Sequence, residues 1–103
     1  MIFIESTAFT QDLPELLSDE AYASFQQYLL VNPRAGDVVQ GTGGLRKIRW
    51  NVAGRGKRGG VRVIYFHRGT HDQIRLLVIY RKGIKDDLTA AEKKTLRTLN
   101  ENW

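Results

Sequence analysis

The sequence lacks cysteine altogether, which excludes disulfides and the thiolate sites that hold metals or carry redox chemistry. It also lacks any apolar run that approaches the roughly 18 residues of a membrane span, so we expect no membrane association. The first residues, MIFIESTAF, hold a carboxylate at Glu5 and no cationic leader, unlike a secretory signal. Together these absences predict a cytoplasmic protein.

Acidic residues are nearly missing from one stretch of the chain. Residues 46–85 hold twelve cations and a single acid, Asp72, whereas residues 1–45 hold six acids and one cation, and the net charge is +5. Like charges concentrated in this way repel one another and weaken the folded state. A polyanion such as nucleic acid is the simplest partner that would offset the repulsion.

Length and hydrophobic periodicity predict one small domain that spans residues 1–103. The expected elements are strands over 2–6, 45–52, 60–68 and 73–82, a helix over 17–33, a short helix or turn over 9–17 interrupted near Pro14, and a final helix over 88–103. The last strand is apolar on both faces, as expected at the centre of a sheet. On the final helix, Leu96, Leu99 and Trp103 share a face that is expected to pack on the core.

The expected fold class is α+β. N-terminal helices are predicted to pack on a mainly antiparallel sheet, and the chain is predicted to close with a C-terminal helix.

Cations recur on the predicted strands. Alternation along residues 45–52 places Lys47 and Arg49 on one face. On the next strand, Arg62 shares a face with apolar side chains, an unusual position for a guanidinium unless it lies at a sheet edge or on the floor of a cleft. Pairing of the strands would bring these residues close to those that follow the last strand. The candidate catalytic cluster comprises Lys47, Arg49, Arg62, Tyr80, Lys82 and Lys85.

Other chemical signatures are weak. The stretch GRGKRGG has the glycine content of a phosphate loop, but Arg58 stands where such a loop needs Ser or Thr, and Asn51 replaces its first glycine. The two histidines have one carboxylate nearby, which is too few ligands for a metal site. We therefore expect no metal and no cofactor, and we interpret Asp86 and Asp87 as helix-capping acids.

Three stretches carry a resemblance to a known family: GTGGLRKIRW, GKRGGVRVIY and LLVIYRKGIKDDLTAAEKK. They resemble the HigB group of the RelE/ParE toxin superfamily, and the resemblance extends over nearly the whole chain. It implies a small RelE-like domain and a bacterial toxin that cuts messenger RNA in the decoding site of the ribosome. It also implies a cognate antitoxin protein that holds the toxin inactive, in a complex that binds operator DNA through the antitoxin.

The resemblance also implies roles for the cations. RelE-like enzymes place basic residues on the strand that corresponds to Lys47 and Arg49, where they would assist the 2′-hydroxyl or stabilise charge. An arginine at the position of Arg62 would hold the scissile phosphate. Cations after the last strand, here Lys82 and Lys85, would neutralise the leaving side.

A tyrosine in the C-terminal segment completes the site of the best-described relatives. Residues 86–103 contain neither Tyr nor His, so Tyr80 is the nearest candidate for that role. The remaining cations of the basic stretch are expected to contact the RNA backbone, including ribosomal RNA. These are Arg46, Arg55, Lys57, Arg58 and Arg81.

Two other functions stay open at this point. The same superfamily includes ParE-type inhibitors of gyrase, which need no RNA-cleaving cluster, and Lys47, Arg49 and Arg62 argue against that alternative. A regulator that binds nucleic acid without cutting it would need the charge alone.

The Gly-rich stretch 53–60 leads to a salt-dependence prediction. Because Arg55, Lys57 and Arg58 would contact phosphates, replacing Lys57 and Arg58 with alanine should flatten the slope of log affinity against log salt by about 0.7 to 0.9 for each lost contact. Titrations of the protein with ribosomal RNA at several salt concentrations measure this slope. An unchanged slope would assign the stretch to a role other than phosphate binding.

Overall fold

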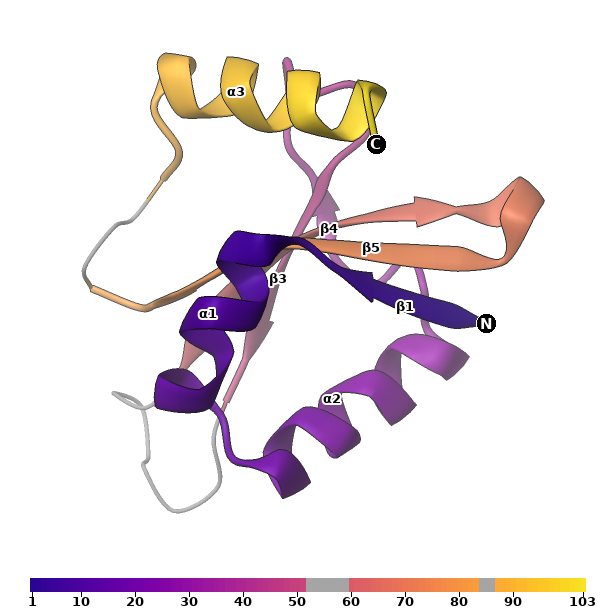
Figure 1. Ribbon diagram of the computed structural model, residues 1–103, viewed down its shortest axis with the longest axis vertical. Coiled ribbons are helices and arrows are strands. Elements are labelled where there is room, and N and C mark those ends of the chain that lie inside the picture. The colour runs from indigo at the N-terminus through magenta and orange to yellow at the C-terminus, as the bar shows by residue number, and fades with distance from the viewer. Residues whose placement is uncertain (52–59, 84–86) are drawn as a thin grey trace.

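The computed structural model describes residues 1–51, 60–83 and 87–103. The elements run, in chain order, β1 (Ile2–Glu5), α1 (Thr7–Leu16), α2 (Asp19–Val31), β2 (Asp37–Val38), β3 (Arg46–Trp50), β4 (Val61–Arg68), a 3-10 turn (Gly69–His71), β5 (Gln73–Arg81) and α3 (Ala90–Glu101) (Figure 1). This arrangement confirms the expected α+β class, with a mainly antiparallel sheet and a C-terminal helix.

The strands form one sheet in the order β1-β5-β4-β3-β2. β1 runs parallel to β5, and the other pairs are antiparallel. The prediction that the 73–82 strand is the centre of the sheet is wrong: the middle strand is β4, and β5 is its neighbour. The reason is β2, a two-residue strand in a stretch where no strand is predicted. It lengthens the sheet on the far side of β4.

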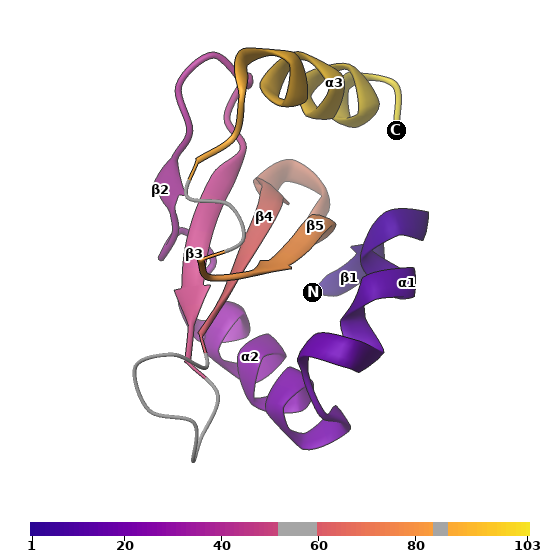
Figure 2. The same ribbon diagram turned by 90° about the vertical axis from the view of Figure 1, so that its left-hand side faces the viewer.

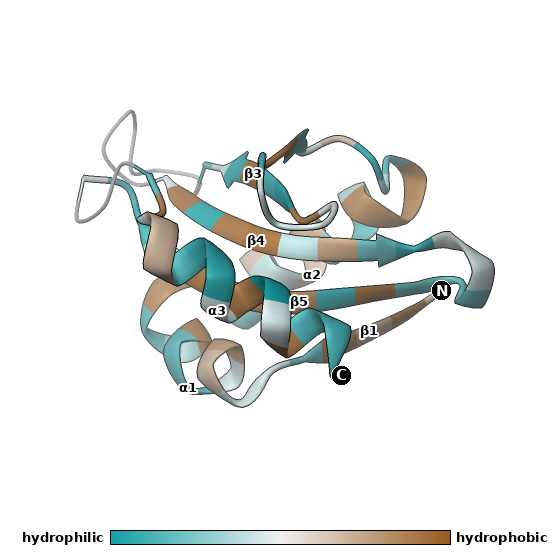
Figure 3. Ribbon diagram, turned by 90° about the horizontal axis from the view of Figure 1, so that it is seen from above, coloured by the Kyte–Doolittle hydropathy of each residue, from teal (hydrophilic) through white to brown (hydrophobic). Residues whose placement is uncertain are grey.

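Helices cover both faces of the sheet. α1 and α2 lie on one face, and α3 lies on the other (Figures 1 and 2). The first face packs on α1 and α2 through a cluster that includes Phe9, Phe25, Leu29, Val63 and Ile74. The second packs on α3 through Leu45, Ile64, Leu77, Leu88 and Leu96. Figure 3 shows that the residues of β4 are apolar over much of the strand. Both faces are therefore buried along the central strands.

The helices of the structure differ from the predicted helices mainly near their ends. α1 continues through Pro14 and ends at Leu16, so the proline falls in the last turn and does not break the helix. In α3, the capping box of Thr89 and Glu92 forms as its spacing requires. The prediction that Leu99 packs in the core is wrong, since its side chain is 43% exposed. None of the described helices combines the length and the apolar character needed to cross a membrane.

An irregularity in the pairing of β4 with β5 changes which residues share a face. Ile64 pairs with Val78, whereas the next residue, Tyr65, pairs with Leu76. Leu77 is therefore an extra residue on β5, which is the signature of a β-bulge. A bulge shifts the alternation of side chains between the two faces of the sheet by one residue. Two residues on either side of the bulge whose spacing would put them on opposite faces therefore lie on the same face.

Ser6 ties α1 to this bulge. Its hydroxyl oxygen accepts a hydrogen bond from the Phe9 N–H at 3.0 Å, which caps α1, and it donates to the Leu77 carbonyl at 2.6 Å. The Ser6 N–H also donates to the Leu76 carbonyl at 2.9 Å. One buried side chain thus satisfies a helix end and a carbonyl at the bulge.

We predict that Ser6→Ala destabilises the protein more than Ser18→Ala. Ser18 caps α2 by accepting from the Ala21 N–H, and losing such a cap costs about 1 kcal/mol. Ser6→Ala would lose a comparable cap and also leave the Leu77 carbonyl without its hydroxyl donor, which adds about 1 to 3 kcal/mol. Urea denaturation of both variants measures the difference. Equal losses would mean that the hydroxyl bond at the bulge contributes nothing.

Candidate nucleic-acid interface

A row of polar side chains crosses three strands on the face covered by α3. Arg49 of β3 pairs in register with Arg62 of β4, and Arg62 pairs with Tyr80 of β5. Residues directly opposite one another point to the same face of a sheet. We call Arg49, Arg62 and Tyr80 the three-strand row. The structure thus brings together three of the residues that the sequence singles out.

The bulge at Leu77 places Tyr80 in this row. Arg75 is also on the α3 face, where it contacts Asn100, yet it lies an odd number of residues before Tyr80. Without the extra residue, simple alternation would put Arg75 and Tyr80 on opposite faces. The bulge lets β5 contribute to both the row and the anchoring of α3.

Arg62 is the most unusual member of the row. Its side chain is 8% exposed, and the hydrogen bond it makes is a long one, 3.4 Å from Nη1 to the Val61 carbonyl. Within the described ranges, no carboxylate forms an ion pair with it. A buried charge is normally paired, because removing it from water is costly. Among the described residues, Arg62 therefore has no anionic partner of the kind that a buried charge normally requires.

Arg75, in the same sheet, is a buried arginine whose guanidinium has hydrogen-bond partners. It is 6% exposed, and its guanidinium donates to the Gln73 side chain at 2.9 Å and to the Asn100 carbonyl and side-chain oxygens at 3.0 and 3.1 Å. It also lies 5.3 Å from the centre of the Trp103 ring. This network holds the end of α3 on the sheet. Sequence patterns did not single out Arg75, because its partners Asn100 and Trp103 lie near the distant C-terminus.

The environment of the row is electrostatically unfavourable. Arg49 and Arg62 are directly opposed like charges, which destabilises a strand pair. Burial raises the pKa of the Tyr80 phenol, the charge of Arg62 lowers it and that of Asp87 raises it. The net direction is upward, so Tyr80 is a neutral hydrogen-bond donor at neutral pH. An anion bound at the row would relieve the repulsion and accept from this phenol.

Lys47 lies one step along the same face, where it pairs in register with Ile64. Its ammonium donates to the Asp87 carboxylate at 3.1 Å. The interpretation of Asp87 as a helix cap is wrong, because Thr89 caps α3; Asp86 lies outside the described residues. Asp87 instead places a carboxylate beside the row. The sequence offered no signal for this contact, which joins residues forty positions apart.

The other predicted cations do not join the row. Arg46 is on the opposite face, where its guanidinium donates to the carbonyls of Gly36 and Arg34 at 2.7 and 3.2 Å. Arg81 pairs with Val61 and also belongs to that face. Lys82 is exposed just beyond β5, and its N–H donates to the Gly60 carbonyl at 3.1 Å. Four candidates lie outside the described residues: Arg55, Lys57, Arg58 and Lys85.

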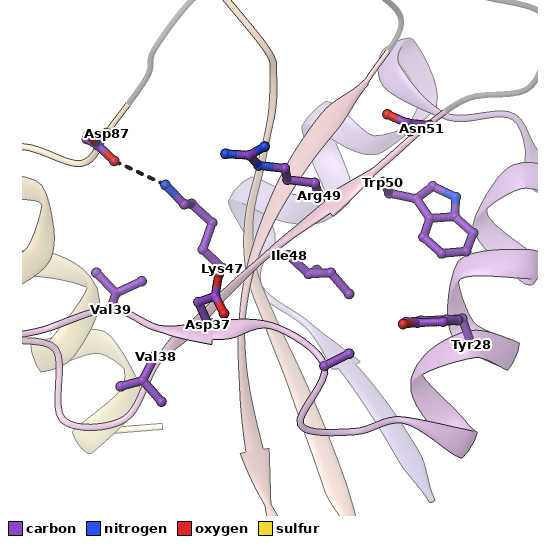
Figure 4. A pocket seen from close by; sticks show the side chains of 11 residues that line it. Tyr28, Asp37, Val38, Val39, Lys47, Ile48, Arg49, Trp50, Asn51 and Asp87 are labelled. Atoms are coloured by element: carbon purple, nitrogen blue, oxygen red, sulfur yellow. Dashed lines mark hydrogen bonds and ion pairs between the residues drawn. The ribbon is translucent and has the colours of Figure 1, made fainter. Parts of the chain in front are cut away.

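An open groove of about 770 Å³ runs along the outer edge of β3 (Figure 4). Lys47, Arg49 and Asp87 lie at one end, and Tyr28 and Trp50 lie at the other. The two aromatic rings are 5.5 Å apart between centres. The sequence alone does not indicate this groove, because β3 and α2 meet only in the folded chain.

No protein-family model matches the chain. In the part of the chain that the structure describes, no three His, Asp or Glu side chains gather as a metal site would require.

We predict that replacing the two buried arginines changes the free energy of unfolding in different ways. Arg62→Met removes a buried charge that has no described counterion, so the free energy of unfolding should stay unchanged or rise by about 1 kcal/mol or more. Arg75→Met leaves the Asn100 and Gln73 oxygens without their donor, and should lower it by about 3 kcal/mol. Chemical denaturation of both variants is the measurement. If Arg62→Met lowers the free energy of unfolding as much as Arg75→Met does, the folded protein itself provides stabilising interactions for Arg62.

Proposed function

We propose that the protein is a ribosome-dependent endoribonuclease that cuts messenger RNA, and that it acts as the toxin of a toxin-antitoxin pair. The observation that carries the proposal is Arg62, a buried guanidinium without a described anionic partner. A phosphate of the RNA backbone is the anion whose charge and geometry best match a guanidinium. The two neighbours of Arg62 in the three-strand row would contact the same phosphate.

The chemistry needs no metal or cofactor, because RNA carries its own nucleophile. The 2′-oxygen forms a bond to the adjacent phosphorus, and the bond from phosphorus to the 5′-oxygen breaks. The products are a 2′,3′-cyclic phosphate and a 5′-hydroxyl. One proton leaves the 2′-hydroxyl, and one is gained by the 5′-oxygen. The enzyme must align these atoms, stabilise the negative charge on the phosphate and move both protons.

The residues divide these tasks by position. Arg62 and Arg49 stabilise the charge on the phosphate, and the neutral Tyr80 phenol donates a hydrogen bond to it. The Asp87 carboxylate, held by Lys47 at 3.1 Å, accepts the 2′-hydroxyl proton.

Lys82 or Lys85 supplies the proton of the leaving 5′-oxygen. The ribosome aligns the messenger strand by holding it in the decoding site. A cognate antitoxin would silence this site by covering its cationic surface or by blocking entry to the ribosome.

We predict that Arg62→Ala lowers cleavage of messenger RNA on programmed ribosomes by about 100-fold to 1,000-fold, the effect of removing one preorganised donor. The rate is measured from the cleaved fraction over time. Arg68→Ala is the matched control, because it removes an arginine from the far end of the same strand, β4, and should leave the rate nearly unchanged. Full turnover by a well-folded Arg62→Ala protein would remove Arg62 from the mechanism.

Primer extension on messenger RNA from cells that make the protein separates the three classes of function. Cuts linked to codons support the nuclease. DNA damage without such cuts would instead indicate inhibition of gyrase. The absence of both would leave a regulator that only binds nucleic acid.

A further inference from the structure

The groove beside β3 has two chemically different ends. Tyr28 is 42% exposed at its rim, and the half-buried Trp50 packs edge-on against Phe25 at 5.4 Å, which fixes the orientation of the indole. At the other end, Arg49 connects the groove to the three-strand row. Single-stranded nucleic acid is recognised by this combination of aromatic rings for its bases and cations for its phosphates.

The edge of β3 is open along the groove. β2 pairs with Arg46 and Lys47 only, so in the described part of the chain no strand pairs with Ile48 and the residues after it on the side of β3 away from β4. The Val39 N–H donates to the Leu45 carbonyl at 2.8 Å, so the backbone groups of Leu45 point outward. Continued alternation along the strand points those of Arg49 outward as well. Backbone donors and acceptors therefore line the space between the aromatic and the cationic ends.

The wall of the groove opposite β3 is held in place. The Tyr65 hydroxyl donates to the Pro33 carbonyl at 3.0 Å and accepts from the Gly36 N–H at 2.9 Å. A side chain at Gly36 would meet the Lys47 carbonyl oxygen and the Tyr65 ring, both at 2.9 Å from its first carbon. The turn that includes the groove residue Ala35 is thus fixed before any ligand binds, which lowers the entropic cost of binding.

Two carboxylates, those of Asp37 and Asp87, line the groove, and each has Lys47 as a neighbour. Asp87 is engaged by Lys47, and Asp37 lies opposite Lys47 in the strand register. Both acids therefore gather around Lys47, and within the described ranges Arg49 forms no ion pair.

We propose that this groove binds one nucleobase of the RNA whose phosphate lies at the three-strand row, with the base stacked on Tyr28 and Trp50. The inference rests on the proposed function and adds a subsite to it. A volume of about 770 Å³ lies within the range of small-molecule pockets. An extended peptide would also fit an open strand edge, but it brings no phosphate to Arg62. An RNA strand can place a base in the groove and a phosphate at the buried guanidinium of Arg62 at the same time.

The test uses the tryptophan inside the groove as a reporter. In a Trp103→Phe background, which leaves Trp50 as the single tryptophan, the protein is titrated with a 2′-O-methylated uridine hexamer that cannot be cut. Binding should quench the Trp50 fluorescence. Tyr28→Ala should weaken binding roughly tenfold, as expected for loss of a base–aromatic stack, whereas Tyr28→Phe should bind like the parent protein.

A hexamer that keeps the sugar-phosphate backbone but lacks bases provides the matched control. It should bind the parent protein more weakly, and Tyr28→Ala should weaken it no further. An equal effect of Tyr28→Ala on both hexamers would overturn the subsite, because the tyrosine would then act through the fold or the phosphates.

Two further results would also overturn the subsite. One is binding, seen by anisotropy of a labelled hexamer, that does not quench Trp50; the groove would then be left for another ligand, such as a peptide strand. The other is no binding of either hexamer. Neither result decides the proposed function, which is tested separately by the Arg62→Ala cleavage assay on programmed ribosomes.

Discussion

The rest of the site depends on one unfavourable placement, the guanidinium of Arg62 inside the sheet. Its burial removes hydration without supplying a described counterion, and Arg49 stands directly opposite with the same charge. In a marginally stable domain, a cost of only about one or two kcal/mol is a large fraction of the total stability. Here the apolar clusters on both faces of the sheet offset the cost, so the fold can hold the charge where an anion would complete it.

The bulge in β5 is the device that makes this arrangement compatible with a stable fold. β5 has to present Arg75 to the C-terminal helix and Tyr80 to the three-strand row, on the same face of the sheet. Strict alternation cannot do both at that spacing. The extra residue, Leu77, adds its own side chain to the cluster beneath α3, and Ser6 accommodates its carbonyl. Bulges near functional sites commonly redirect side chains in this way.

Local signals predicted most of the fold, and long-range contacts account for what they missed. The periodicity of the two longer helices and the alternation that puts Lys47 and Arg49 on one face depend on neighbouring residues, and the structure confirms both. The bulge and the Lys47–Asp87 ion pair depend on how distant strands meet, which no local pattern encodes. β2 was missed because two residues cannot establish a period. The exposure of Leu99 depends on how α3 is seated on the sheet, since its helical face alone indicated burial.

The open edge of β3 raises the question of why two copies of the protein would not pair there. Unpaired strand edges invite association, and proteins often protect them with short strands and charged side chains. The open part of β3 is short, and it carries Arg49. Antiparallel pairing of two such edges near Arg49 would bring their guanidinium groups together, and each already faces Arg62 across the sheet. The same repulsion that a bound phosphate would relieve in the proposed function thus also disfavours self-association at this edge.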